Sequence, residues 1–277
     1  MKHRFYIPVF TSLLVFSACA KKENATPAIK NTTAPAAVNA AVSLEKTANA
    51  LDGIWISHDY LTTIEKTKQI YANAAHKATL FGFMLYKDKM LTGKPDMEGF
   101  NTFEGGYIYP LLYNDAGYFE LDKVRRGKYP ESDYMQVRPL TDGNAEITYT
   151  KSGKKDVFRK ISGSDKVDEN ILNNTISSMI FNGTYIDKRT GKKITFTNGR
   201  VSGMGKLNLF GVMYAFEERN FDEVYFGSDQ TTENTVNYHF VYSNGAITLY
   251  PVLRPAGNND TYTYSKTPSY ILEPVQQ

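Results

Sequence analysis

The chain has 277 residues, of which 42% are hydrophobic and 22% are charged, and its formal net charge at pH 7 is +3. This charge is too small to indicate a nucleic-acid-binding protein, which needs a strongly basic face. The single cysteine excludes an internal disulfide or a zinc site made of several thiolates. The sequence therefore predicts a protein whose fold depends on its hydrophobic core.

The first 18 residues have the composition of an export signal. A positively charged start precedes a mostly apolar stretch, residues 5–16, which is too short to span a membrane. The small residues Ser17 and Ala18 stand directly before Cys19. This order resembles the lipobox of bacterial lipoproteins, with Phe16 at a position where leucine is more usual.

The resemblance implies that residues 1–18 are a cleaved signal peptide and that Cys19 becomes the N-terminus, modified by acyl chains such as palmitate. Two or three acyl chains hold a protein stably on a membrane. Cleavage removes Lys2 and Arg4, so the formal charge falls by two, from +3 to +1. Ala20 replaces the Asp that often retains lipoproteins at the inner membrane. We therefore expect a lipid-anchored protein of the cell envelope, at the outer membrane.

Residues 19–50 follow the cysteine and are predicted to form a flexible tether. They contain no aromatic residue and are rich in Ala, Asn, Thr and Lys. A segment of this composition cannot bury enough apolar surface to offset the entropy lost on ordering. Its last part, from Ser43 to Leu51, has apolar residues at helical spacing and predicts a short helix.

The remaining chain, residues 51–277, contains an internal repeat. Leu51–Ile56 matches Phe181–Ile186, because each reads apolar, Asx, Gly, any residue, aromatic, Ile. Each copy also follows a candidate helix. We predict a first repeat at 51–161, a linking helix at 162–180 and a second repeat at 181–277.

Further matches extend the repeat and locate an insertion. Gly53 and Gly183 are 130 residues apart, whereas the matched Phe119 and Phe226 are 107 apart, so the first copy has 23 extra residues. Tyr60–Ala78 has a helical apolar pattern and is the predicted insertion. The other matches are Asn101–Phe103 with Asn208–Phe210, Arg138-Pro139 with Arg254-Pro255, Gly143-Asn144 with Gly257-Asn258, and Thr148–Lys151 with Thr263–Lys266.

The other segments predict strands, since they are short and rich in aromatic and β-branched residues. Asn198-Gly199, Asp142-Gly143 and Asn244-Gly245 between them favour tight hairpin turns. The predicted fold class is mostly β, with two repeated antiparallel barrel units, a helical insertion in the first and a linking helix between them. The alternative is that each copy is half of one larger barrel. The predicted strands include 107–113, 134–138, 145–150, 193–197, 236–242 and 246–253.

Gly53-x-Trp55 at the start of the first strand, after a short helix, resembles the signature of lipocalins and related calycin barrels. The resemblance implies that Trp55 closes one end of a barrel and that Tyr185 is its counterpart. It also implies a cavity for an apolar or amphipathic small molecule, with an inserted helix as a lid. Arg138 and Arg254 are then candidates for binding a ligand carboxylate. The alternative is that each Arg-Pro pair ends a strand with the arginine outside.

Residues with catalytic chemistry are few. His58 and Asp59 follow the first strand and His76 ends the insertion, but they show no metal-ligand spacing. We therefore expect no catalytic site, no metal and no cofactor.

The second functional hypothesis is a structural or interaction module that binds an envelope protein or a glycan. The basic clusters 123–128 and 188–193 are interpreted as solvated hairpin tips, or as contacts for anionic lipid or glycan. The sequence leaves the oligomeric state open.

Overall fold

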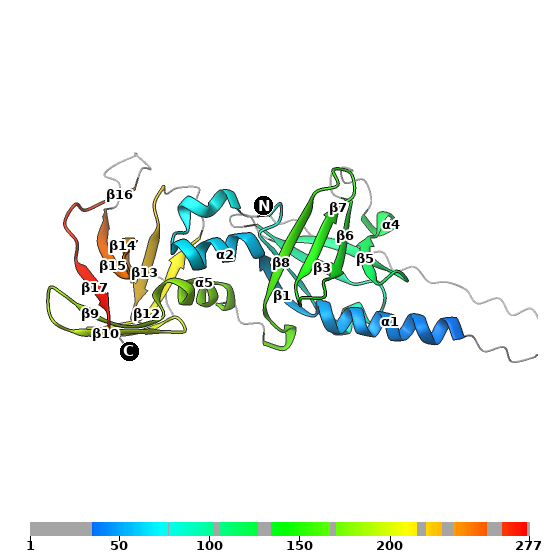
Figure 1. Ribbon diagram of the computed structural model, residues 1–277, viewed down its shortest axis with the longest axis horizontal. Helices are drawn as coiled ribbons and strands as arrows, with labels where there is room; N and C mark the ends of the chain where they lie inside the picture. The colour runs from blue at the N-terminus through cyan, green and yellow to red at the C-terminus, as the bar shows by residue number, and fades with distance from the viewer. Residues whose placement is uncertain are drawn as a thin grey trace, which may run out of the picture. The chain divides into compact units, whose positions relative to one another are not determined.

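The computed structural model describes residues 35–76, 78–101, 106–126, 134–166, 170–214, 220–228, 235–253 and 262–275 (Figure 1). These residues form two closed barrels, each with eight antiparallel strands. The predicted fold class is confirmed, and the alternative of one larger barrel is wrong. The two units are consistent with lipocalin-like architecture, since eight strands enclose a space that side chains or one small ligand can fill.

The first barrel follows helix α1 (Pro35–Leu51), and its strands are paired in chain order, with β8 closing on β1. Short helices α3 (Lys87–Met90) and α4 (Lys123–Arg126) lie in its connections. The strands are β1 (Gly53–Ser57), β2 (Gly82–Leu85), β3 (Asp96–Phe100), β4 (Tyr107–Asn114), β5 (Tyr118–Leu121), β6 (Met135–Pro139), β7 (Ala145–Tyr149) and β8 (Lys155–Ser162).

The second barrel follows the short helix η3 (Ser164–Lys166) and helix α5 (Ile171–Phe181). It closes through the pairs β14–β15, β15–β17 and β17–β9, while the short β16 (Thr263–Tyr264) adds to the end of β15. The barrel strands are β9 (Gly183–Asp187), β10 (Lys193–Thr197), β11 (Arg200–Met204), β12 (Leu207–Met213), β13 (Glu223–Gly227), β14 (Val236–Ser243), β15 (Ala246–Leu253) and β17 (Tyr270–Pro274).

The repeated helix–Gly–strand junction has a backbone reason. Gly53 and Gly183 have φ values of +133° and +123°, a region that residues with a Cβ rarely adopt. A Cβ on Gly53 would also lie 2.2 Å from the carbonyl oxygen of Ser162. Each glycine therefore lets a helix end, at Leu51 or Phe181, pass directly into the first strand of a barrel. The predicted match between these two segments is confirmed.

The matches predicted at the other end of each copy are wrong. Arg138 lies in β6, the sixth strand of the first barrel, whereas Arg254 comes after β15, the seventh strand of the second. Thr148 lies in β7, but Thr263 lies in the additional strand β16. The structural counterpart of the β6–β7 turn is the Asn244-Gly245 turn between β14 and β15, whose two residues have positive φ as predicted. The sequence matches are thus displaced by one strand.

One match in the middle of each copy is also wrong. Asn208 and Phe210 lie in β12, the fourth strand of the second barrel, whereas Asn101 follows β3 of the first. Strand pairing makes Tyr113 the counterpart of Phe210, since these residues pair with the matched Phe119 and Phe226. The match of Phe119 with Phe226 is itself consistent with the strand order, because both lie in the fifth strand of a barrel.

The predicted helical insertion is confirmed. Helices α2 (His58–Thr67) and η1 (Tyr71–His76) stand between β1 and β2, whereas a turn at residues 188–192 connects the equivalent β9 and β10. Part of the segment predicted as tether is helical, because α1 begins at Pro35. Its side chains Ala48 and Leu51 are buried in the core of the first barrel.

Candidate functional site

The interiors of both barrels are filled with large apolar side chains. In the second barrel, Phe181 from α5 and four strand phenylalanines have ring centroids 5.1 to 6.4 Å apart. In the first, Phe83 contacts Phe158 at 5.0 Å and Trp55 at 6.0 Å. Side chains at these separations are in van der Waals contact. The four strand phenylalanines are Phe196, Phe210, Phe226 and Phe240, and all are buried.

The inserted helix of the first copy packs on the core of the second barrel. Tyr60, Leu61 and Ile64 of α2 are fully buried and belong to the same hydrophobic cluster as the interior phenylalanines of the second barrel. Phe81, which precedes β2, belongs to this cluster too. Lys68, just after α2, donates to the carbonyl oxygen of Met179 in α5 at 2.5 Å. The insertion expected to be a lid therefore covers apolar surface of the other copy.

The carboxylate of Asp222 fastens this insertion to the second barrel. It precedes β13, and its Oδ1 accepts hydrogen bonds from the backbone N–H groups of Ile70 and Tyr71, at 2.8 and 2.6 Å. Burial raises the pKa of Asp222, and these two hydrogen bonds oppose the shift without cancelling it. A carboxylate that is mostly removed from water thus holds the start of η1.

Tyr60, Phe81, Tyr214 and Asp222 form a group that we name the junction cluster. The Tyr60 and Phe81 rings lie 5.1 Å apart in edge contact, and Phe81 stacks on Tyr214 at 6.0 Å. The Tyr60 side chain is fully buried, and its hydroxyl has no hydrogen-bond partner among the described residues. Burial, together with the Asp222 charge and Tyr214, raises the pKa of Tyr60 far above its usual value. The hydroxyl is therefore a neutral donor.

A second aromatic group surrounds His239 on the outer face of the second barrel. His239 alternates along β14 with the core residues Tyr238 and Phe240, so it points outward. Its ring centroid lies 4.1 Å from that of Tyr264 and 5.2 Å from that of Phe221. Burial lowers the pKa of His239, and Nδ1 donates to the carbonyl oxygen of Asp222 at 2.8 Å. These contacts pack β16 and the segment before β13 onto the outer face of β14.

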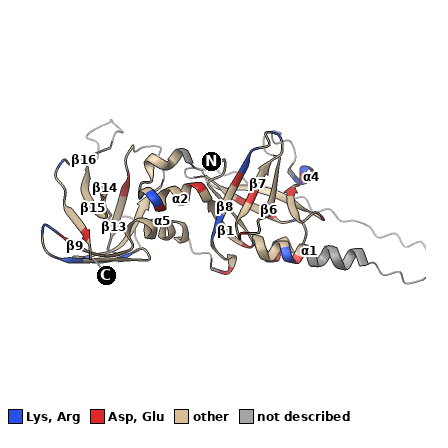
Figure 2. Cartoon of the chain, viewed as in Figure 1, with Lys and Arg blue, Asp and Glu red and all other residues tan. Residues whose placement is uncertain are grey.

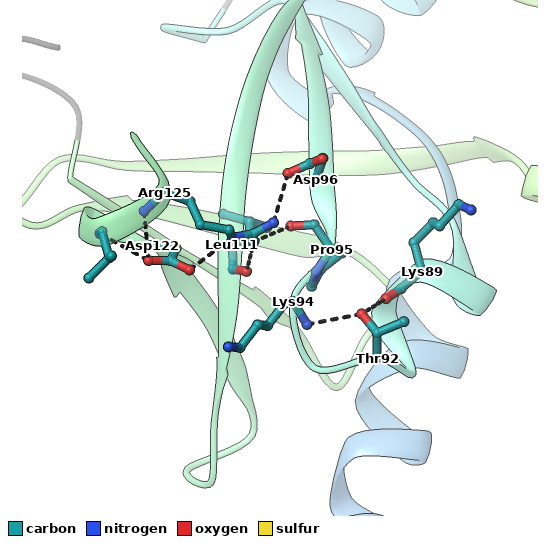
Figure 3. A network of polar contacts seen from close by, with 9 residues as sticks. Lys89, Thr92, Lys94, Pro95, Asp96, Leu111, Asp122 and Arg125 are labelled. Atoms are coloured by element: carbon teal, nitrogen blue, oxygen red, sulfur yellow. Dashed lines mark hydrogen bonds and ion pairs between the residues drawn. The ribbon is translucent and has the colours of Figure 1, made fainter. Parts of the chain in front are cut away.

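The first barrel contains a polar network centred on Arg125 of α4 (Figure 3). Its guanidinium donates to Asp122 at 2.9 Å, to Asp96 at 3.2 Å, and to the backbone carbonyl oxygens of Pro95, at 3.0 Å, and Leu111. The pKa of Asp122 is lowered, chiefly by its hydrogen bond from Arg125. One side chain thus joins α4 to β3 and β4, which is a structural role.

The two residues predicted at the barrel ends lie within the cores. Trp55 is buried, and its indole N–H donates to the carbonyl oxygen of Leu51 at 2.9 Å, at the end of α1. Tyr185 is also buried, and its hydroxyl makes a long contact of 3.5 Å to the carbonyl oxygen of Asn182. Each aromatic side chain thus reaches back to the helix end that precedes its barrel.

The structure describes one of the two predicted ligand-binding arginines, Arg138. Arg138 alternates along β6 with the core residue Val137 and is exposed. It forms an ion pair with Glu146 of the neighbouring β7, with Nη2 2.8 Å from Oε1. A position on the outer face does not fit contact with a ligand inside the barrel. Arg254 and Cys19 lie outside the described residues.

The histidines do not form a metal site among the described residues. His58 and Asp59 are neighbours at the start of α2, with Nδ1 and Oδ1 3.5 Å apart, and the Asp59 side chain is largely exposed. The side chain of His76 lies outside the described set. Across the described ranges, no group of three or more His, Cys, Asp or Glu side chains is placed to hold a metal ion. In the same ranges, no helix has the length and apolar character needed to cross a bilayer.

Comparison with known proteins finds no family model, no curated protein and no solved structure that matches the chain. The likeness to lipocalins therefore rests on the architecture of the two barrels and on the helix–Gly-x-Trp junction. Sequence reasoning missed the junction cluster, although Tyr60 and the helical insertion were both identified. The missing information was that the insertion contacts the second copy.

Proposed function

We propose that this protein is a lipid-anchored, non-enzymatic binding protein of the cell envelope, which holds an apolar or amphipathic small molecule at the junction cluster. The buried Tyr60 hydroxyl carries the proposal. A buried hydroxyl without a partner costs about 1–3 kcal/mol, and small-molecule sites combine apolar walls with a few fixed polar groups. An amphipathic ligand with an acceptor atom would satisfy Tyr60 and contact Phe81 and Tyr214.

The junction suits a ligand better than the barrel interiors do. A molecule inside either barrel would have to displace buried phenylalanines that already contact one another. At the junction, a ligand would also have to move buried side chains of α2, but there the Tyr60 hydroxyl, which has no partner among the described residues, offers it a hydrogen bond. The insertion would then act as a lid, as its sequence suggested, and it would cover the second barrel.

The proposed location rests on the sequence before the folded part. Ser17, Ala18 and Cys19 have the order of a lipoprotein cleavage site, and Ala20 favours the outer membrane. The acylated N-terminus would hold the folded barrels at a membrane surface, where amphipathic molecules are concentrated.

The filled interiors favour a second candidate function. A barrel whose interior is packed with side chains is a rigid scaffold, and its outer surface is then the part that can bind. Ile108 and Leu112 of β4 are 61% and 37% exposed in the first barrel. Under this alternative the protein is an interaction module for an envelope protein or a glycan.

The experiment uses residues 36–277, which contain all described strands and both hydrophobic cores. The chain is exported to the periplasm without the acylated cysteine, purified without detergent and extracted with organic solvent for mass spectrometry. We expect an amphipathic molecule in stoichiometric amount from the wild type, and much less from Tyr60→Phe. Tyr113→Phe is the matched control, since its hydroxyl donates to Ser43 in the first barrel. An empty extract from folded wild-type protein would favour the interaction module.

A further inference from the structure

One end of the second barrel carries six exposed basic side chains. The turn between β9 and β10 packs against β17 and the segment before it, since the Lys188 N–H donates to the carbonyl oxygen of Ile271 and Arg189 donates to that of Pro268. The start of β10 lies beside the end of β11, with which it is paired, and β11 leads there into the turn before β12. We name this surface the basic end, and Figure 2 shows Lys and Arg in blue around the turn that joins β9 to β10. Its residues are Lys188, Arg189, Lys192, Lys193, Lys206 and Lys266, all exposed.

Two carboxylates at this end, among the described residues, offset a third of the six positive charges. Asp187 is fully buried, where it accepts hydrogen bonds from the Thr190 hydroxyl at 2.6 Å and from the backbone of Arg189 and Ile271. Burial alone would raise its pKa, but these hydrogen bonds outweigh burial and lower the pKa. Glu273 forms an ion pair with Lys188. Asp187 therefore stabilises the turn from a buried position, and the exposed surface stays positive.

Several basic side chains elsewhere in the described chain form ion pairs with carboxylates. Arg159 makes two hydrogen bonds to Glu65, Arg125 is bound by two aspartates, and Arg138 pairs with Glu146. Lys154 pairs with the buried Asp156. The excess of positive charge at the basic end is thus a local property, since the whole chain has a formal net charge of only +3.

We propose that the basic end is a docking surface for anionic membranes. Five of its six cations are lysines, which act as flexible point charges and suit a diffuse layer of phosphate head groups. Its residues come from the β9–β10 and β11–β12 turns, the first residue of β10 and the segment between β16 and β17. Basic residues near an anionic bilayer contribute about 1 kcal/mol each. The inference depends only on these charges and not on a ligand at the junction cluster.

The test measures binding of residues 36–277 to sedimenting vesicles. One set contains 30% phosphatidylglycerol in phosphatidylcholine, and the other is phosphatidylcholine alone. We expect binding to the anionic set only, with an affinity that falls as salt rises from 50 to 300 mM, because salt screens exposed charges. The double variant Lys192→Glu, Lys193→Glu should bind at least about 30-fold more weakly.

The matched control is Lys94→Glu, Lys151→Glu, which makes the same change in net charge on exposed residues of the first barrel. It should keep anionic-vesicle binding within about threefold of the wild type. Equal losses in both double variants would mean that only net charge matters and would overturn the proposal, as would equal binding to both vesicle sets or no binding by the wild type. Heparin is added in a separate arm. If it binds the wild type and the anionic vesicles do not, the surface serves a soluble polyanion and the membrane proposal is wrong.

Discussion

The hydroxyl of Tyr60 permits a sharp test of the packing at the junction. Tyr60→Phe keeps the ring, with its edge contact to Phe81 at 5.1 Å, and removes only the oxygen. That oxygen is buried and has no partner among the described residues. Removing an unsatisfied buried hydroxyl should recover its desolvation cost, so we expect the ligand-free variant to be more stable than the wild type by about 1–2 kcal/mol.

The assay is thermal and urea unfolding of residues 36–277, after solvent extraction and refolding to remove any bound molecule. A gain of this size corresponds to a Tm rise of about 2–4 °C in a chain of this length. The control Tyr113→Phe loses a hydrogen bond of 2.8 Å to Ser43, so its stability should fall by about 1 kcal/mol. If Tyr60→Phe is destabilised as Tyr113→Phe is, the Tyr60 hydroxyl has a partner in the ligand-free protein, and the reasoning that led to a binding site at the junction is refuted.

Two further predictions concern charged side chains. Burial raises the folded-state pKa of Asp222 above its usual value, so its contribution to stability is present at low pH and is lost as pH rises through the raised pKa. Asp222→Asn keeps an acceptor for both N–H groups, so urea unfolding should show the variant to be more stable than the wild type at pH 7.5, with a difference in stability that closes toward pH 4. A difference in stability that does not depend on pH would contradict the raised pKa. Arg125→Ala removes the contacts of its guanidinium to Asp122, Asp96 and two backbone carbonyls (Figure 3) and should cost about 2 kcal/mol. Arg138→Ala removes an exposed ion pair and should cost less than about 1 kcal/mol in the same assay. Equal costs would mean that the Arg125 network is no more important than a surface ion pair.

The parts of the fold that were predicted correctly depend on local backbone requirements. The helix–Gly–strand junction repeats because both Gly53 and Gly183 need positive φ. The Asn198-Gly199 and Asn244-Gly245 turns have positive φ at both residues, which is why those residue types predict tight hairpins. The strands at 193–197 and 246–253 have the predicted bounds, since aromatic and β-branched residues pack well on a sheet.

The wrong matches come from the similarity of all strands in a β-rich chain. Thr148-Tyr149 and Thr263-Tyr264 are both strand residues, yet the first pair lies in a barrel and the second in the added β16. Residue types favoured in strands recur at many positions, and they do not encode which strand follows which. Only the hydrogen-bonded pairing of strands, such as that of Val252 with Tyr264, shows that β16 is not one of the eight barrel strands.

The sequence by itself determined the local elements of this protein: two helix–Gly–strand junctions, the hairpin turns, a helical insertion in the first copy, and a cysteine in a lipobox-like context. Only the tertiary structure decided that the insertion packs on the other copy, where Asp222 binds Ile70 and Tyr71 across about 150 residues of sequence. It also decided that Arg138 points outward and that the basic turns meet at one end of the second barrel. Local patterns follow from backbone sterics and residue type, whereas contacts between distant segments depend on strand order and barrel closure, which no short stretch of sequence specifies.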